Sequence, residues 1–183
     1  RIAVDTVVHN VLMENFRFYM IVGGMPAAVQ EFSNRRNLKE VLYVQNQIID
    51  LYRGDVKKYS QTDKNKITAI FNNIPNELDA HNKRFTLKNV NEHAKMREYE
   101  DAFIWLQDAG VALPCFNLKE PKAPLRLNEQ SRLFKLFLND CGLLCAMSFQ
   151  GTQFNILSGN LKANLGSFFE NIVAQSLVAN GLE

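Results

Sequence analysis

The four residues Gly23-Gly24-Met25-Pro26 stand between two apolar segments and restrict the fold more than any other part of the chain. A glycine just past the end of a helix adopts a left-handed conformation that other residues resist. A proline fits the first turn of the next helix, because the N–H that it lacks would have had no partner there. The segment therefore predicts one helix that ends at Gly23 and another that begins at Pro26.

Residues 1–60 are predicted to form a small helical bundle. Apolar side chains recur at steps of three and four residues, which is typical of a helix with one apolar face. In the first helix these side chains are Val7, Val8, Val11, Leu12, Phe16, Tyr19 and Met20. A short helix from Pro26 to about Phe32 and a longer one from about Leu38 to about Tyr59 are expected to follow.

Residues 61–147 have the element order of a winged helix, a three-helix core with a β-hairpin. Thr62 or Asp63 is predicted to cap a helix that stops before Pro75, because proline disfavours helix at the residue before it. The other expected elements are an extended piece at 82–87, helices near 89–93 and over 97–109, and strands over 111–118 and 133–138. Residues 148–183 form a third part, whose amphipathic helix over 165–180 ends at Gly181.

Composition excludes several classes of protein. The chain has 46% hydrophobic and 22% charged residues and a net charge of +2, values too ordinary to indicate a membrane or nucleic-acid surface. No apolar run approaches the roughly 20 residues of a membrane helix. The three cysteines (Cys115, Cys141, Cys145) are too scattered for a disulfide framework and lack histidines at metal-ligand spacing, so they are interpreted as core residues in a reducing, cytoplasmic setting.

The sequence offers no catalytic residue and no metal site. Gly23-Gly24 lacks the Gly-Lys-Ser/Thr ending of a phosphate-binding loop and follows a helix instead of a strand, so tight nucleotide binding is not expected. The predicted wing carries the one basic cluster, for which contact with nucleic acid and contact with a protein partner are both considered, beside the simpler interpretation of a solvated loop. Its members are Lys119, Lys122, Arg126, Arg132 and Lys135.

Six short segments, in order, resemble the C-terminal half of a large prokaryotic family of predicted ATPases of the AAA+ superfamily. They are Phe18-Tyr19-Met20 with Gly23-Gly24-Met25-Pro26; Tyr52-Arg53-Gly54-Asp55; Ile74-Pro75 with Asn82-Lys83-Arg84-Phe85; Tyr99-Glu100-Asp101-Ala102 with Trp105-Leu106 and Ala109-Gly110; Phe134-Lys135-Leu136-Phe137 with Asp140 and Gly142-Leu143-Leu144; and Gly166 with Glu170-Asn171. The resemblance covers nearly the whole chain.

The resemblance implies a protein in which an ATPase core, with its ATP and Mg²⁺, is followed by a domain of unknown function. Residues 1–60 would be a lid-like bundle that packs on that core, and 61–147 a winged-helix domain. Residues 148–183 would begin a fold resembling PD-(D/E)XK nucleases, with Glu170 as the remnant of its motif. The chain starts at Arg1 and stops at Glu183, so we expect a fragment without the Walker motifs and without the catalytic strands.

The predicted fold class is therefore mainly α with a small β component: a lid-like bundle, a winged helix and a truncated terminal helix. The function expected first is a non-catalytic regulatory or interaction region of an ATP-binding protein, whose partners are the ATPase core of the same polypeptide and a DNA or protein molecule, with no membrane. The alternatives are a DNA-binding winged helix and part of a nuclease.

Overall fold

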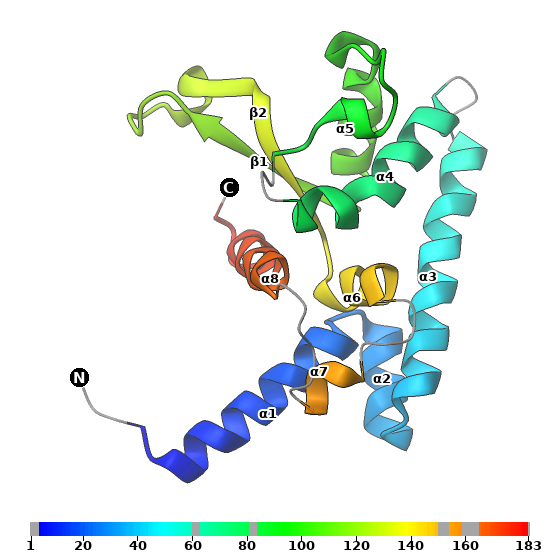
Figure 1. The fold of residues 1–183 in the computed structure, drawn as a ribbon, viewed down its shortest axis with the longest axis vertical. Helices are drawn as coiled ribbons and strands as arrows, with labels where there is room; N and C mark the ends of the chain where they lie inside the picture. The colour runs from blue at the N-terminus through cyan, green and yellow to red at the C-terminus, as the bar shows by residue number, and fades with distance from the viewer. Residues whose placement is uncertain (1–3, 60–62, 81–83, 150–153, 159–164, 183) are drawn as a thin grey trace. The chain divides into compact units, whose positions relative to one another are not determined.

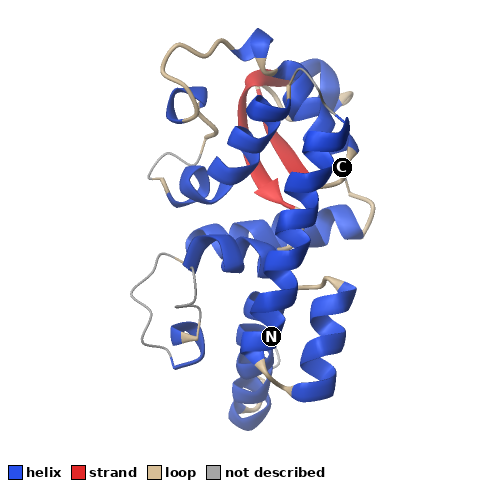
Figure 2. Ribbon diagram, turned by 90° about the vertical axis from the view of Figure 1, so that its right-hand side faces the viewer, coloured by secondary structure: helices blue, strands red, loops and turns tan. Residues whose placement is uncertain are grey.

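A computed structural model describes residues 4–59, 63–80, 84–149, 154–158 and 165–182 of the chain. These residues are mainly α-helical, with one two-stranded antiparallel sheet (Figures 1 and 2), as the sequence predicts. They divide into two compact units. Unit 1 is Arg1–Ile49 with Asp140–Ile172, and unit 2 is Asp50–Asn139 with Val173–Glu183. The three domains predicted at 1–60, 61–147 and 148–183 group the residues differently.

Unit 1 begins with the first two of the three helices that the sequence predicts and with the first half of the third. Helix α1 (Thr6–Val22) starts at Asp5, whose carboxylate accepts a hydrogen bond from the Val7 N–H at 2.8 Å. Helix α2 (Pro26–Arg35) has proline in its first turn, and α3 (Leu38–Tyr59) follows. Their core is small: Val22, Ala28 and Val41 are buried, with Met25, Phe32, Leu38 and Val44 packed against them.

The rest of unit 1 comes from a distant part of the chain. Helix α6 (Cys141–Phe149) is buried from Cys141 to Ala146 and packs on α1. Helix α7 (Asn155–Ser158) also packs on α1, and α8 (Gly166–Ala179) stacks Phe168 on Phe149 and Phe169 on Phe16. Burial of residues 141–146 between neighbours is what so apolar a composition requires.

Unit 2 holds the second half of α3, α4 (Lys64–Asp79), α5 (Glu100–Asp108) and the hairpin of β1 (Ala112–Leu118) and β2 (Glu129–Leu138). The strands pair from Ala112 with Leu138 to Phe116 with Phe134, and the register then shifts so that Asn117 faces Gln130. Short 3₁₀ turns lie at Leu87–Asn89, Met96–Glu98 and Leu125–Asn128.

Aromatic rings form the centre of unit 2. Phe85 and Phe134 stack with their centroids 6.1 Å apart, and Phe103 meets both rings edge-on at 5.3 and 5.1 Å. Such offset and edge-to-face pairs stabilise a core beyond the area that they bury. The Phe85 N–H also donates to the Phe134 carbonyl at 2.9 Å, which ties the segment before the 3₁₀ turn to β2.

The structure corrects the sequence prediction in several places. Helix α4 continues through Pro75 to Asp79 instead of stopping before the proline, because its apolar face (Ile70, Ile74, Leu78) stays buried past that point. Asp63 is the N-cap residue of α4, as predicted, but its side chain makes no capping hydrogen bond and its carboxylate accepts one from Lys66 at 2.7 Å.

Two other predicted elements also differ. The helix predicted over 97–109 is split into a 3₁₀ turn and α5, and the helix near 89–93 is the 3₁₀ turn Leu87–Asn89. The first part of the extended piece predicted at 82–87, up to residue 83, lies outside the described residues, as does Thr62.

Candidate functional site

The turn between α1 and α2 is held by a carboxylate from 116 residues further along the chain. The Gly24 N–H donates to Oδ2 of Asp140 at 2.6 Å, and the Leu143 N–H donates to Oδ1 at 2.9 Å. Asp140 therefore binds the turn with one oxygen and the first turn of α6 with the other. We call this arrangement the turn clasp. It joins two of the segments on which the family resemblance rests.

Two glycines allow the turn clasp to close. Gly23 has φ 72° and ψ −161°, a conformation that is essentially restricted to glycine. A Cβ at Gly23 would overlap Oδ1 of Asp140 and lie 2.7 Å from its Oδ2. A Cβ at Gly142 would lie 2.6 Å from the carbonyl carbon and oxygen of Val22. Neither position accepts a side chain without moving its neighbours.

Gln45 completes the turn clasp from α3. Its side chain is buried, and Nε2 donates to the carbonyls of Ile21 at 2.7 Å and Val22 at 3.1 Å. These carbonyls belong to the last turn of α1, where no further helical N–H is present to bond them. Gln45 therefore donates to the last carbonyl groups of α1, while Asp140 accepts from the backbone N–H of the turn that follows it.

Burial controls the acid–base chemistry of this region. It raises the pKa of Asp140 above the ordinary 3.8, against the opposing effect of backbone N–H groups from Gly24, Leu143, Gly142 and Met25. Burial, assisted by nearby Asp140, raises the pKa of the Cys141 thiol to about 12 and the pKa of Cys145 further. Burial likewise raises the pKa of Tyr19 to about 12. Thiols protonated to this extent are poor nucleophiles and poor metal ligands.

Sequence reasoning identified Gly23-Gly24-Met25-Pro26 as a helix junction but missed its partners. The signal that was present is local: Asp140 directly precedes the apolar run of α6, which is the position of an N-cap. Nothing local indicates that its second oxygen binds Gly24, or that Gln45 is buried. The three cysteines lie in described elements and form no disulfide. Among the described residues, no cluster of three metal-ligating side chains occurs.

The five residues of the predicted basic cluster lie on β2 and on the segment that joins it to β1. Lys119 is exposed at the end of the hairpin, whereas Lys122 pairs with Glu120 at 2.7 Å and Lys135 is half-buried in β2. Arg126 is exposed in the 3₁₀ turn Leu125–Asn128. Arg132 belongs to β2, but its side chain lies outside the described residues.

Glu170 lies on α8, where its side chain is half-buried. The neighbouring Ser167 and Asn171 are buried, and neither adds a second carboxylate.

The first half of α1 exposes an apolar stripe. Val7 is 69% exposed, Val8 50%, Val11 52% and Leu12 57%, and Val4, just before the helix, is 60% exposed. These residues follow the i, i+3, i+4, i+7 pattern of a face made to be covered. The stripe continues into Phe16, which stacks on Phe169, and then into the buried Met20. We call the five exposed residues the α1 stripe.

Residues 13–154 match a protein family described as Domain of unknown function (DUF8612), and the chain belongs to this family. The match includes the whole turn clasp and the hairpin. No curated protein and no solved structure matches the chain significantly. Within the described parts of the chain, no helix combines the length and the apolar character needed to cross a bilayer.

Proposed function

We propose that the chain is a non-catalytic regulatory and interaction region of an ATP-binding protein of the AAA+ superfamily. Its partner is the ATPase core of the same polypeptide, which supplies the site for ATP and Mg²⁺. The α1 stripe is the observation that carries this proposal, because exposed apolar faces on folded proteins mark surfaces that bind other proteins. The family resemblance supports the choice of partner. The reduced cysteines support a cytoplasmic location.

The size of the α1 stripe favours a tethered partner. Five valine and leucine side chains, each about half exposed, contribute roughly 1 kcal/mol apiece when covered. The total of about 5 kcal/mol is comparable to the translational and rotational freedom lost when two separate molecules associate. A partner on the same polypeptide avoids most of that cost, since its effective concentration is high.

Two experiments test this proposal. The first asks whether the gene encodes a phosphate-binding loop in the same reading frame; a gene without one refutes the proposal. The second produces the core and this chain as separate polypeptides and measures their association by anisotropy. We expect the Val7→Ser/Val11→Ser variant to bind about tenfold more weakly, as the loss of 1 to 2 kcal/mol implies. The control Val29→Ser/Tyr43→Ser removes apolar groups exposed elsewhere on unit 1 and is expected to bind as the wild type does.

A second candidate is a winged-helix module in unit 2 that contacts DNA through its hairpin. The exposure of Lys119 and Arg126 favours it, although the ion pair between Lys122 and Glu120 reduces the charge available to phosphate. Titration of a labelled duplex at low and moderate salt tests this surface. An affinity that is unchanged in Lys119→Ala/Lys122→Ala/Arg126→Ala excludes it.

A further inference from the structure

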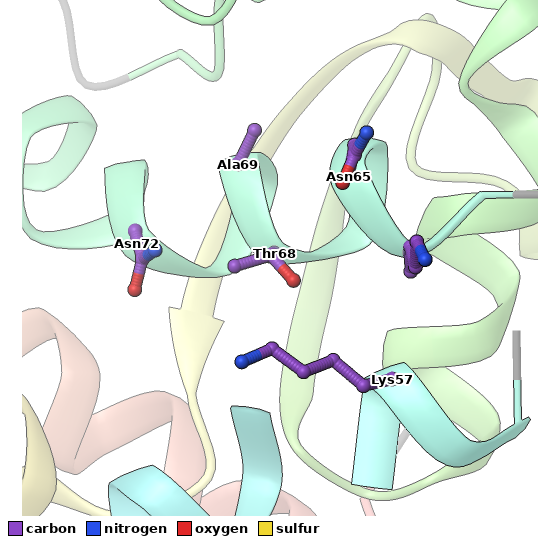
Figure 3. Close-up of a pocket in the computed structure, with 6 residues that line it drawn as sticks. Lys57, Asn65, Thr68, Ala69 and Asn72 are labelled. Carbon is purple, nitrogen blue, oxygen red and sulfur yellow. The ribbon is translucent and has the colours of Figure 1, made fainter. Parts of the chain in front are cut away.

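A groove of about 400 Å³ lies between the second half of α3 and α4, within unit 2 (Figure 3). It is lined by Lys57, Lys64, Asn65, Thr68, Ala69 and Asn72. Lys57 reaches from α3 toward Thr68 and Asn72 on α4, as the close-up shows. None of the residues that line the groove belongs to the β1–β2 hairpin, so the groove is distinct from the predicted wing.

The two lysines of the groove have no acidic partner. Neither Lys57 nor Lys64 forms a salt bridge with any described residue, and no carboxylate is among the lining side chains. Two other cations nearby are paired with carboxylates: Arg53 with Asp50 at 3.0 Å, and Lys66 with Asp63 at 2.7 Å. The groove thus presents two uncompensated ammonium groups, one from each wall.

The remaining polar groups of the groove can act as hydrogen-bond donors. Arg53 donates from Nε at 3.1 Å and from Nη2 at 2.9 Å to Oδ1 of Asn72. Because a guanidinium group only donates, these two bonds fix which end of the amide faces Arg53. The Nδ2 group of Asn72 keeps both N–H donors for another partner. The Thr68 hydroxyl and the Asn65 amide make no hydrogen bond to a described side chain.

This combination of side chains selects the chemistry of the ligand. Ammonium, amide and hydroxyl donors that line a groove without an acidic group are suited to the oxygens of a phosphate. No aromatic ring lines the groove to stack on a base, and no carboxylate is present to bind a sugar hydroxyl or an amine. Four of the lining residues are exposed, so the groove is accessible from solvent.

We propose that the α3–α4 groove binds the phosphodiester backbone of a nucleic acid, independently of base sequence, through Lys57, Lys64 and Asn72. This site requires neither the ATPase core nor the wing. Two lysine–phosphate contacts supply a large part of non-specific affinity at low salt, because each contact releases counterions from the nucleic acid.

The sharpest test replaces the side-chain amide of an asparagine on α4 by a carboxylate, once inside the groove and once outside it. Asn72→Asp keeps an acceptor for Arg53, so the fold is retained, but it places a carboxylate among the lysines. Asn76→Asp makes the same exchange at an exposed position outside the groove. Binding of a fluorescein-labelled duplex is measured by anisotropy at about 50 mM salt. We expect Asn72→Asp to bind about tenfold more weakly and Asn76→Asp within about twofold of the wild type.

A second pair of variants measures the number of phosphates bound. Lys57→Gln/Lys64→Gln is expected to lower affinity about 100-fold near 50 mM salt and to reduce the slope of log affinity against log salt by about two. The control Lys39→Gln/Lys58→Gln removes two exposed lysines of α3 that do not line the groove. Its slope is expected to stay close to that of the wild type. Circular dichroism checks that each variant is folded.

Several results overturn this proposal. A wild-type chain that does not bind the duplex at low salt overturns it, as do control variants that weaken binding as much as the groove variants. Inorganic phosphate that displaces the duplex at equal phosphate concentration indicates a site for free phosphate. Polyglutamate that displaces it at equal charge indicates an acidic polypeptide instead. A loss confined to the Lys119→Ala/Lys122→Ala/Arg126→Ala variant assigns the contact to the wing.

Discussion

Replacement of Gly23 by alanine is the most direct test of the turn clasp. The new methyl group would stand where Oδ1 of Asp140 now lies, and the backbone would keep a conformation that alanine resists. The substitution therefore forces the chain either to expel the carboxylate or to move the turn. Both responses separate Asp140 from the Gly24 N–H.

The cost follows from two independent effects. Holding alanine at φ 72° and ψ −161° costs about 1 to 3 kcal/mol. Loss of the hydrogen bond from Gly24 to a charged, buried acceptor costs about 1.5 to 3 kcal/mol more. The expected loss of about 2.5 to 6 kcal/mol is a large fraction of the roughly 5 to 15 kcal/mol that stabilises a typical domain.

Urea unfolding followed by far-ultraviolet circular dichroism measures this loss, and Gly54→Ala is the matched control. Gly54 lies within α3, and a Cβ there meets no atom within 4 Å, so alanine is expected to stabilise the helix by about 0.5 to 1 kcal/mol. Adding Asp140→Ala to Gly23→Ala removes the clash, and the double variant should lose less stability than the two single variants together. A Gly23→Ala chain within about 1 kcal/mol of the wild type would refute this account of the turn.

Three further predictions concern buried polar groups and thiols. Burial raises the pKa of Asp140, so the folded chain binds the carboxyl proton of Asp140 more tightly than the unfolded chain does. Protonation of Asp140 therefore stabilises the fold. This contribution is complete below pH 3.8 and is lost as the pH rises through the folded-state pKa. The difference in unfolding free energy between wild type and Asp140→Asn should therefore shrink from acidic to neutral pH; a difference that grows with pH contradicts the assignment. Glu77 is buried on α4 and accepts hydrogen bonds from Asn73 at 3.0 Å, Asn89 at 2.6 Å and the Thr86 N–H at 2.8 Å, so Glu77→Gln, which turns one acceptor into a donor, should cost about 1 to 3 kcal/mol in urea unfolding. An unchanged midpoint would show that these bonds are dispensable. Thiol titration with a chromogenic disulfide should label Cys115 in the native chain and Cys141 and Cys145 only after denaturation, because the last two are buried with raised pKa values; rapid native labelling of Cys115→Ser would disprove this.

Local sequence predicted those elements whose limits are set by their own residues. Gly23 and Pro26 fix the junction of α1 and α2, and the change in the spacing of apolar residues after Gly110 predicts β1. These signals act through backbone conformation within a few residues, and no distant partner is needed to interpret them.

Long-range contacts account for what the sequence did not predict. Pro75 is a helix breaker by local rules, yet the burial of Ile74 and Leu78 on the two sides of it keeps α4 intact. Gln45 and Glu77 are of residue types that usually lie on the surface, and their burial depends on carbonyl and amide groups contributed by other segments. The groove likewise needs α3 and α4 together, since Lys57 and Lys64 are ordinary solvated residues on either helix alone.

The distance in sequence between the two sides of the turn clasp also sets an order of events during synthesis. A ribosome that adds about 5 to 20 residues per second needs roughly 6 to 23 s to pass from Gly24 to Asp140, which are 116 residues apart. Throughout that interval α1 and α2 are present without α6, so the apolar surface that α6 will cover stays exposed. Unit 2, most of whose residues are contiguous, can form during the same wait. The chain is thus most exposed to aggregation and to chaperones while its N-terminal helices have been synthesised and α6 has not.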